Sequence, residues 1–255
     1  MNMNNKNRFL SQQGEDIFIY NNFINVNTPD GIFVELGAMD GICYSNTYFF
    51  ENTLGFKGVL IEPTKLYEKL KLNRPNSDCY NLAVSHNTEP VKILGNCATA
   101  GISALMSDAF KKAHHTNDIN EYYVNAKPIR DILEESKIKY IDLLSIDVEG
   151  GELVVLNTID WTIPIYVIVI ELDKSNIEKD EKCREILKKN GFILYHRMCI
   201  NEFWVNINYF RKNILWDANN IINNHDISNK SIFPYTEKHV ITEINDSLNK
   251  YRFTI

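Results

Sequence analysis

The sequence has no long hydrophobic run. Its longest apolar stretch, residues 163–170, contains Pro164 and is too short to span a bilayer. The first eight residues are mostly polar and include no apolar segment of the kind that secretion signals carry. We therefore expect no membrane insertion and a cytoplasmic protein.

Paired cysteines and basic blocks are also missing. The five cysteines are odd in number and widely spaced, and none forms a CxxC pair, which excludes a disulfide framework and a structural zinc site. Acidic residues (33) outnumber basic ones (27), the formal net charge is −6, and no basic cluster stands out. This balance argues against nucleic acid as a partner and favours a small or uncharged substrate.

Hydrophobic patterning between residues 10 and 208 alternates between strand-like and helix-like segments. We expect strands at 32–36, 58–62, 78–84, 140–147 and 164–172, helices at 14–25, 45–54, 63–72, 150–158 and 182–190, and a closing hairpin of 192–196 with 203–207. Alternation of this kind predicts an α/β fold with a mostly parallel, doubly wound sheet.

Two segments fall outside this pattern. Residues 95–125 form an insertion, and its pair His114-His115 is interpreted as exposed loop histidines rather than as metal ligands. Residues 209–255 are rich in asparagine and form a C-terminal appendage to a domain at 1–208. Three roles remain open for the appendage: a lid, a contact in a homo-oligomer, or a partly disordered segment.

The first two strands end in residues suited to a nucleoside. Gly37 follows the first strand and permits a close backbone approach, and Glu62 ends the second strand, where its carboxylate can accept both hydrogen bonds of a ribose diol. The second and third glycines of a dinucleotide fingerprint are absent, and Asp40 would repel a pyrophosphate. An acid at this position suits the cationic ammonium end of S-adenosylmethionine (SAM) better.

Carboxylates also end the fourth and fifth strands. Asp147 and Glu171 can orient a hydroxyl, act as a base or hold a divalent cation, although the sequence alone gives no reason to assign metal ligands. His196, after the strand at 192–195, is a second candidate base, with a structural role as its alternative.

Several motifs together resemble the FkbM family of SAM-dependent methyltransferases. They lie at 11–16, 34–41, 44–47, 58–63, 83–85, 141–152 and 190–206, and the order Asp147-Val148-Glu149-Gly150 is the most distinctive. The resemblance covers about residues 10–208. It implies a Rossmann-like class I methyltransferase fold with a seven-stranded sheet, six strands parallel and one reversed.

The resemblance also implies roles for individual residues. Gly37 and its neighbours would lie against the methionine part of SAM, Glu62 would hold the ribose, residues 81–83 would flank the adenine, and Asp147 would stand beside the methyl group. The predicted cofactor-binding residues are Glu35, Gly37, Asp40, Asn46, Glu62, Asn81, Ala83 and Asp147, and the predicted catalytic residues are Asp147, Glu171 and His196. Members of the family mostly methylate oxygen, often on sugars or on polyketide-like natural products, and we expect an O-methyltransferase acting on a sugar or glycan.

Two other functions are kept as alternatives. A nicotinamide-dependent oxidoreductase would share the nucleoside-binding fold, but Asp40 and the missing glycines disfavour it. A Rossmann-like binding protein without activity would not need the carboxylates at 35, 40, 62 and 147, which are costly to bury without a ligand.

Overall fold

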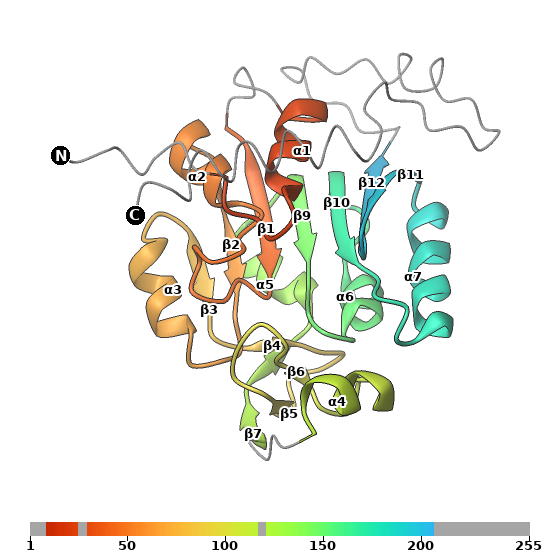
Figure 1. Cartoon of the computed structure of the whole chain (residues 1–255). Coiled ribbons are helices and arrows are strands. Elements are labelled where there is room, and N and C mark those ends of the chain that lie inside the picture. The colour runs from red at the N-terminus through yellow and green to blue at the C-terminus, as the bar shows by residue number, and fades with distance from the viewer. Residues whose placement is uncertain (1–8, 25–29, 117–120, 207–255) are drawn as a thin grey trace, which may run out of the picture.

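The computed structural model describes residues 9–24, 30–116 and 121–206 (Figure 1). Its main element is a seven-stranded sheet in the order β11-β12-β10-β9-β1-β2-β3. The strands are β1 (Ile32–Leu36), β2 (Lys57–Ile61), β3 (Asp78–Tyr80), β9 (Ile141–Ile146), β10 (Ile165–Glu171), β11 (Phe192–Met198) and β12 (Asn201–Asn206). β12 runs antiparallel to both of its neighbours, and the other pairs are parallel. The expected sheet, with six parallel strands and one reversed, is confirmed.

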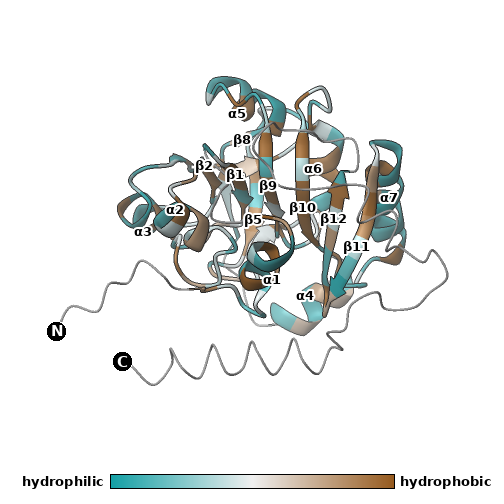
Figure 2. Ribbon diagram, turned by 90° about the horizontal axis from the view of Figure 1, so that it is seen from above, coloured by the Kyte–Doolittle hydropathy of each residue, from teal (hydrophilic) through white to brown (hydrophobic). Residues whose placement is uncertain are grey.

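Helices cover both faces of this sheet. The helices α5 (Ile129–Glu135), α6 (Glu152–Thr158) and α7 (Ile177–Lys189) share one apolar cluster with the strands, whereas α1 (Glu15–Asn22), α2 (Tyr48–Leu54) and α3 (Tyr67–Asn73) share another. Figure 2 shows α5 and α6 on one side of the strands and α1 on the other. The central strands β9 and β10 are apolar along nearly their whole length because both of their faces are covered.

The region between β3 and α5 differs from the sequence-based expectation. Residues 78–84 do not form one strand: β3 ends at Tyr80, and β4 (Ala83–Val84) pairs instead with β8 (Ala126–Lys127). The insertion at 95–125 is part of a three-stranded sheet of β6 (Gly101–Ile102), β5 (Val91–Leu94) and β7 (Glu121–Val124), accompanied by α4 (Asp108–His114). His114 and His115 therefore lie at the end of a helix and not in a loop.

The start of α7 also differs from the expectation, and it has a clear local cause. α7 begins at Ile177, five residues earlier than expected, because the side chain of Asn176 accepts a hydrogen bond from the backbone N–H of Lys179 (3.1 Å). The predicted hairpin forms, as β11 and β12. The appendage at 209–255 lies outside the described residues, and no helix in the described part of the chain is long and apolar enough to cross a membrane.

Candidate active site

A cavity of about 410 Å³ opens at the carboxyl ends of β1, β2, β9 and β10. Ligands of open α/β sheets bind at these strand ends, and the volume suits a nucleoside-sized molecule. Its floor comes from residues 35–37, 61–63, 145, 147–149 and 171 of the main sheet. Residues 97–102, Phe110 and His114 of the insertion form another wall, and Figure 1 shows the small sheet and α4 together at this end of the main sheet. The insertion therefore shapes the ligand site.

Gly37 has an additional reason to be glycine. Its φ is +78°, and a Cβ atom there would lie 1.9 Å from the carbonyl oxygen of Asp147. The backbone N–H of Asp147 also donates to the carbonyl of Leu36 (3.3 Å). The group that lies close to Gly37 is thus the main chain at Asp147, directly after β9. This contact places Asp147 next to the end of β1.

Replacing Gly37 by alanine is expected to lower the free energy of unfolding by about 3 kcal/mol or more, since the clash with the Asp147 carbonyl adds to the strain of a positive φ. Gly55→Ala is the matched control: its φ is +75°, but nothing lies within 4 Å of an added Cβ atom, so it should cost about 1 kcal/mol. Denaturant unfolding of both variants measures the difference. Equal losses of unfolding free energy in the two variants would show that the close contact at Gly37 does not make its replacement more destabilising.

Glu62 is held by two backbone donors at the end of β2. Its Oε2 accepts from the N–H of Met39 and its Oε1 from the N–H of Thr64, both at 2.8 Å. The side chain is buried, which raises its pKa, and these hydrogen bonds oppose the rise. Each carboxylate oxygen still has a lone pair for another donor. Since Glu62 also lines the cavity, its geometry fits a ribose diol.

Asn81, expected beside the adenine, supports this turn from outside the cavity. Its Nδ2 donates to the carbonyl oxygens of Glu62 (2.9 Å) and Thr64 (3.3 Å), and it is not among the lining residues. Its contact with the adenine therefore stays a prediction, and the hydrogen bonds that the structure gives its side chain are to the main chain of this turn. Leu82 and Ala83 do line the cavity.

Glu35 lies at the centre of a buried polar network beneath the loop at 41–47. Its carboxylate accepts from Ser45 Oγ (2.9 Å), the N–H of Asn46 (2.8 Å) and Thr47 Oγ1 (2.6 Å). Glu35 lines the cavity, but most of its hydrogen-bonding capacity is used within the protein.

Arg74 completes this network and was missed from the sequence. It is fully buried, its Nε donates to Glu51 (2.6 Å), and its Nη1 donates to the carbonyl of Gly41 (3.0 Å) and lies 3.8 Å from Glu35. An arginine just after a helix, 39 positions from its partner Glu35, carries no local signal of such a role. Its charge balances two buried carboxylates and fixes the loop that carries Asn46.

Asn46 connects this loop to β9. Its Nδ2 donates to Ser145 Oγ (3.0 Å), and its buried Oδ1 has no hydrogen-bond partner among the described residues. Since Asn46 lines the cavity, that oxygen can accept from a ligand donor such as an ammonium group. Asn46 thus stays a predicted cofactor-binding residue, and the structure places it in the cavity.

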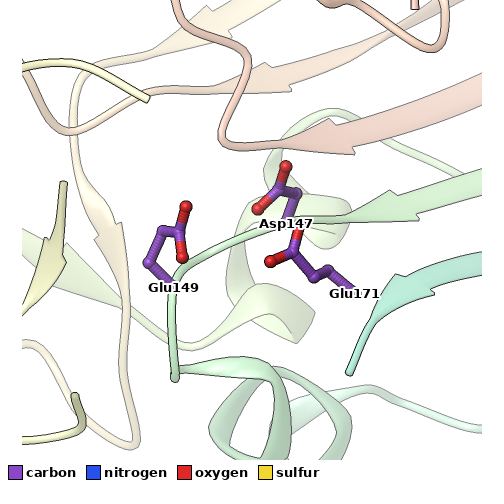
Figure 3. Close-up of side chains that lie close together, drawn as sticks. All are labelled: Asp147, Glu149 and Glu171. Atoms are coloured by element: carbon purple, nitrogen blue, oxygen red, sulfur yellow. The ribbon is translucent and has the colours of Figure 1, made fainter. Parts of the chain in front are cut away.

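Three carboxylates meet in the cavity at the ends of β9 and β10. One oxygen each of Asp147, Glu149 and Glu171 lies within 4.8 Å of the others (Figure 3). Burial is the main cause that raises the pKa of all three carboxyl groups, and repulsion by neighbouring acids raises the values further. The pKa of Glu171 rises to about 7 and that of Glu149 to about 9. Asp147 Oδ1 is buried and has no partner among the described residues.

The sequence predicted two of these three acids. Glu149 and Gly150 both have positive φ angles, +52° and +104°, so the chain makes a left-handed turn shortly after β9. In this turn the carboxylate of Glu149 lies near those of Asp147 and Glu171 (Figure 3). The signal was present in the Asp147-Val148-Glu149-Gly150 motif, but a sequence pattern does not show on which side of a turn a carboxylate lies.

The raised pKa values predict that stability falls with pH. A carboxyl that is more basic in the folded than in the unfolded protein contributes stability below about pH 4.5 and loses it as the pH rises toward 9. The charges of Glu152 and Asp173 also raise the pKa of Glu149, whereas that of Lys179 lowers it. With EDTA present, we expect Glu149→Gln to melt about 3 °C or more above the wild type at pH 9, and by less at pH 6. The exposed Glu68→Gln serves as control, and identical pH curves for Glu149→Gln and the wild type would contradict the prediction.

Two other predicted residues do not reach the cavity. Asp40 Oδ1 accepts from the N–H groups of Ile42 (3.0 Å) and Cys43 (2.8 Å), so it stabilises its own turn. The ring of His196 stacks on Phe18, with centroids 4.7 Å apart. Neither is among the residues that line the cavity, so the structure does not bring Asp40 and His196 together with the other predicted site residues.

The N-terminal segment contributes to the site instead. Gln12 and Glu15 line the cavity, and Glu15 Oε1 accepts from Nδ2 of Asn201 (2.8 Å). Asp16 next to it bonds Ser11 and the N–H groups of Leu10 and Ile17, which is a structural role. Burial raises the pKa of Asp16 to about 6 against these hydrogen bonds.

The seven-stranded sheet with β12 reversed, and a cavity at its strand ends, define a class I methyltransferase-like fold. A family model described as the methyltransferase FkbM domain matches residues 35–194, more than half of the chain. The chain belongs to this FkbM methyltransferase family. The prediction of a methyltransferase that uses SAM is thereby confirmed.

Similarity to solved structures extends over much of the chain at low identity. A fibrillarin/Nop5p complex matches at 14% identity with a TM-score of 0.42, covering 76% of this chain and 79% of that one. Aeropyrum pernix fibrillarin with natively bound SAM matches at 13% identity and 0.39, covering 71% and 66%. TrmK of M. capricolum with S-adenosyl-homocysteine matches at 10% and 0.34, covering 88% and 92%. No curated protein matches the sequence.

Proposed function

We propose that the chain is a SAM-dependent O-methyltransferase that methylates a hydroxyl group of a sugar or glycan. The observation that carries the proposal is the meeting of Asp147 and Glu171 at adjacent strand ends, in the same cavity as Glu62 and Gly37. One end of the cavity thus suits a nucleoside and the other provides proton acceptors.

The lining residues fit SAM in shape and charge. Glu62 is positioned for the ribose hydroxyls, Leu82 and Ala83 offer apolar surface for the adenine, and Asn46 Oδ1 can accept from the ammonium group. A cationic donor is also favoured by the acidic lining, which includes Glu15 and Asp147. We infer that the donor lies along the ends of β2, β1 and β9.

The reaction requires little from the protein beyond positioning and removal of one proton. SAM supplies a methyl group on a positively charged sulfur, so that the C–S bond breaks as the acceptor oxygen forms the C–O bond, and sulfur keeps the electron pair. Asp147 and Glu171 hold the acceptor hydroxyl in line and take its proton. The pKa of Glu171 near 7 suits a carboxylate that accepts a proton at neutral pH.

The carboxylates of the cavity also favour a sugar as the acceptor. Sugars present several neighbouring hydroxyl donors, and each ionised carboxylate oxygen in the cavity is an acceptor. Phosphate or carboxylate groups on the acceptor would be repelled by Asp147, Glu149 and Glu171. The family assignment gives no support to the nicotinamide-dependent alternative, and the carboxylates retained in the cavity argue against an inactive binding protein.

Two measurements test the proposal in sequence. Isothermal titration with SAM, S-adenosylhomocysteine and NADH should show micromolar binding of the adenosyl ligands and none of NADH. Incubation with ¹³C-methyl SAM and panels of uncharged sugars and glycans should then yield a product whose methyl carbon has the NMR shift of an ether. A methyl signal typical of nitrogen or sulfur would overturn the oxygen assignment, and silence with every adenosyl ligand would overturn the whole proposal.

A further inference from the structure

We propose that Asp147, Glu149 and Glu171 together bind one oxygen-preferring divalent cation. The three residues come from the end of β9, the turn after it and the end of β10, and Figure 3 shows their carboxylates converging. The sequence suggested a cation at Asp147 and Glu171 only as one of three uses of these acids. The third carboxylate, Glu149, is what the structure adds.

The spacing of the oxygens matches such an ion. All three ligand oxygens lie within 4.8 Å of one another. An ion equidistant from three oxygens that lie 4.8 Å apart would be about 2.8 Å from each, so shifts of a few tenths of an ångström would bring it into the range of about 2.3–2.6 Å typical of Ca²⁺. Mg²⁺, with its shorter distances of about 2.0–2.1 Å, would require the side chains to close further.

Asp147 provides an independent reason to expect a ligand. Its Oδ1 is shielded from solvent and has no hydrogen-bond donor among the described residues. A buried carboxylate oxygen without a donor is costly, and most such atoms in folded proteins are hydrogen-bonded or bind an ion. The atom belongs to a side chain that faces the other two carboxylates.

Within the described residues, no cation pairs directly with this cluster. The charge of buried Lys179 acts on Glu149 and Glu171, but its ion pairs are with Glu152 and Asp180. In the described part of the chain, no ion pair joins a Lys, Arg or His to Asp147, Glu149 or Glu171. Two positive charges would therefore balance most of the three negative ones, whereas without an ion some of the acids must keep their protons.

The insertion packs against Glu149, the proposed ligand that the sequence did not predict. A Cβ atom on Gly101 would lie 2.9 Å from the carbonyl oxygen of Glu149, and one on Gly150 would lie 2.8 Å from that of Leu105. The insertion thus packs directly on the turn that carries Glu149. A fixed ligand loses less freedom when the ion binds.

The role of the ion rests on the proposed function. A cation at these carboxylates would coordinate the acceptor hydroxyl oxygen, orient it and lower its pKa, and the proton would still pass to a carboxylate oxygen. The binding site itself is independent of that role and can be tested without acceptor or SAM.

Calorimetric titration of the full chain, stripped of metal, with CaCl₂, MnCl₂ and MgCl₂ tests the site. We expect one ion per chain with a Kd of the order of 10⁻⁵–10⁻³ M for at least one of them. Glu171→Gln and Glu149→Gln should each weaken binding at least about tenfold, because each removes one charged ligand. Glu68→Gln removes an exposed acid of α3 and should leave the affinity unchanged.

The outcomes separate this proposal from the proposed function. SAM binding without any ion binding up to about 10 mM, well beyond the weakest protein sites, would overturn the cation site and leave the methyltransferase in place. Ion binding that persists in both glutamine variants would overturn the assigned ligands. Ion binding without SAM binding would support the cation site and overturn the proposed function instead.

Discussion

Glu62→Ala is expected to weaken SAM binding by about 100-fold. The ribose diol would lose two hydrogen bonds to a charged acceptor, and about 1.5 kcal/mol for each corresponds to this factor. The carboxylate is buried and already oriented by the N–H groups of Met39 and Thr64. Calorimetric titration with SAM measures the change.

Two further measurements separate lost binding from lost structure. Alanine leaves the N–H groups of Met39 and Thr64 without their acceptor, so the melting temperature should fall by a few degrees and the circular dichroism spectrum should stay unchanged. Glu68→Ala, in an exposed position of α3, should retain full affinity. A folded Glu62→Ala protein with wild-type affinity would disprove the ribose assignment.

The positions of the strands, and therefore of their ends, were predictable. β1, β2, β9 and β10 are short runs rich in Val, Ile and Leu, and each is followed by a glycine turn or an acid. In a parallel sheet, strand ends that follow such runs gather at one edge. This is why the sequence alone is enough to group Gly37, Glu62, Asp147 and Glu171.

The insertion was not predictable in the same way. β4, β6 and β8 are two residues long, and pairs such as Ala83–Val84 give no periodicity to detect. The strands β4 and β8 depend on each other across more than 40 positions of sequence, since Ala83 pairs with Ala126. The contact of this region with Glu149 was therefore invisible in the sequence.

Three predicted site residues, Asp40, Asn81 and His196, are not among the residues that line the cavity, and one physical cause is common to them. Asp40 and Asn81 lie in the expected loops, but local backbone donors and acceptors take up their side chains. His196 lies on an outer strand whose facing is set by packing against Phe18. Residue type and position predicted the neighbourhood, whereas side-chain direction depends on tertiary contacts that single-sequence patterns do not encode.

Asp147→Asn is expected to reduce the rate of methyl transfer by about 10²–10⁴, the range typical for loss of a positioned base. Asparagine has nearly the same shape, so Gly37 keeps its close contact with the main chain at 147. It also removes one of three mutually repelling carboxylates, so the protein should remain folded and melt no lower than the wild type. Single-turnover transfer from labelled SAM to the acceptor found in the screen measures the rate.

SAM affinity separates a catalytic from a structural role for Asp147. If Asp147 acts on the acceptor proton, the Kd for SAM should change by less than about fivefold, which is about 1 kcal/mol, and the loss should fall on kcat. The rate of the wild type should rise with pH as the carboxylates ionise, and this rise should be flattened in the variant. Wild-type turnover in Asp147→Asn would move the base to Glu171, whose conversion to glutamine should then show the same loss.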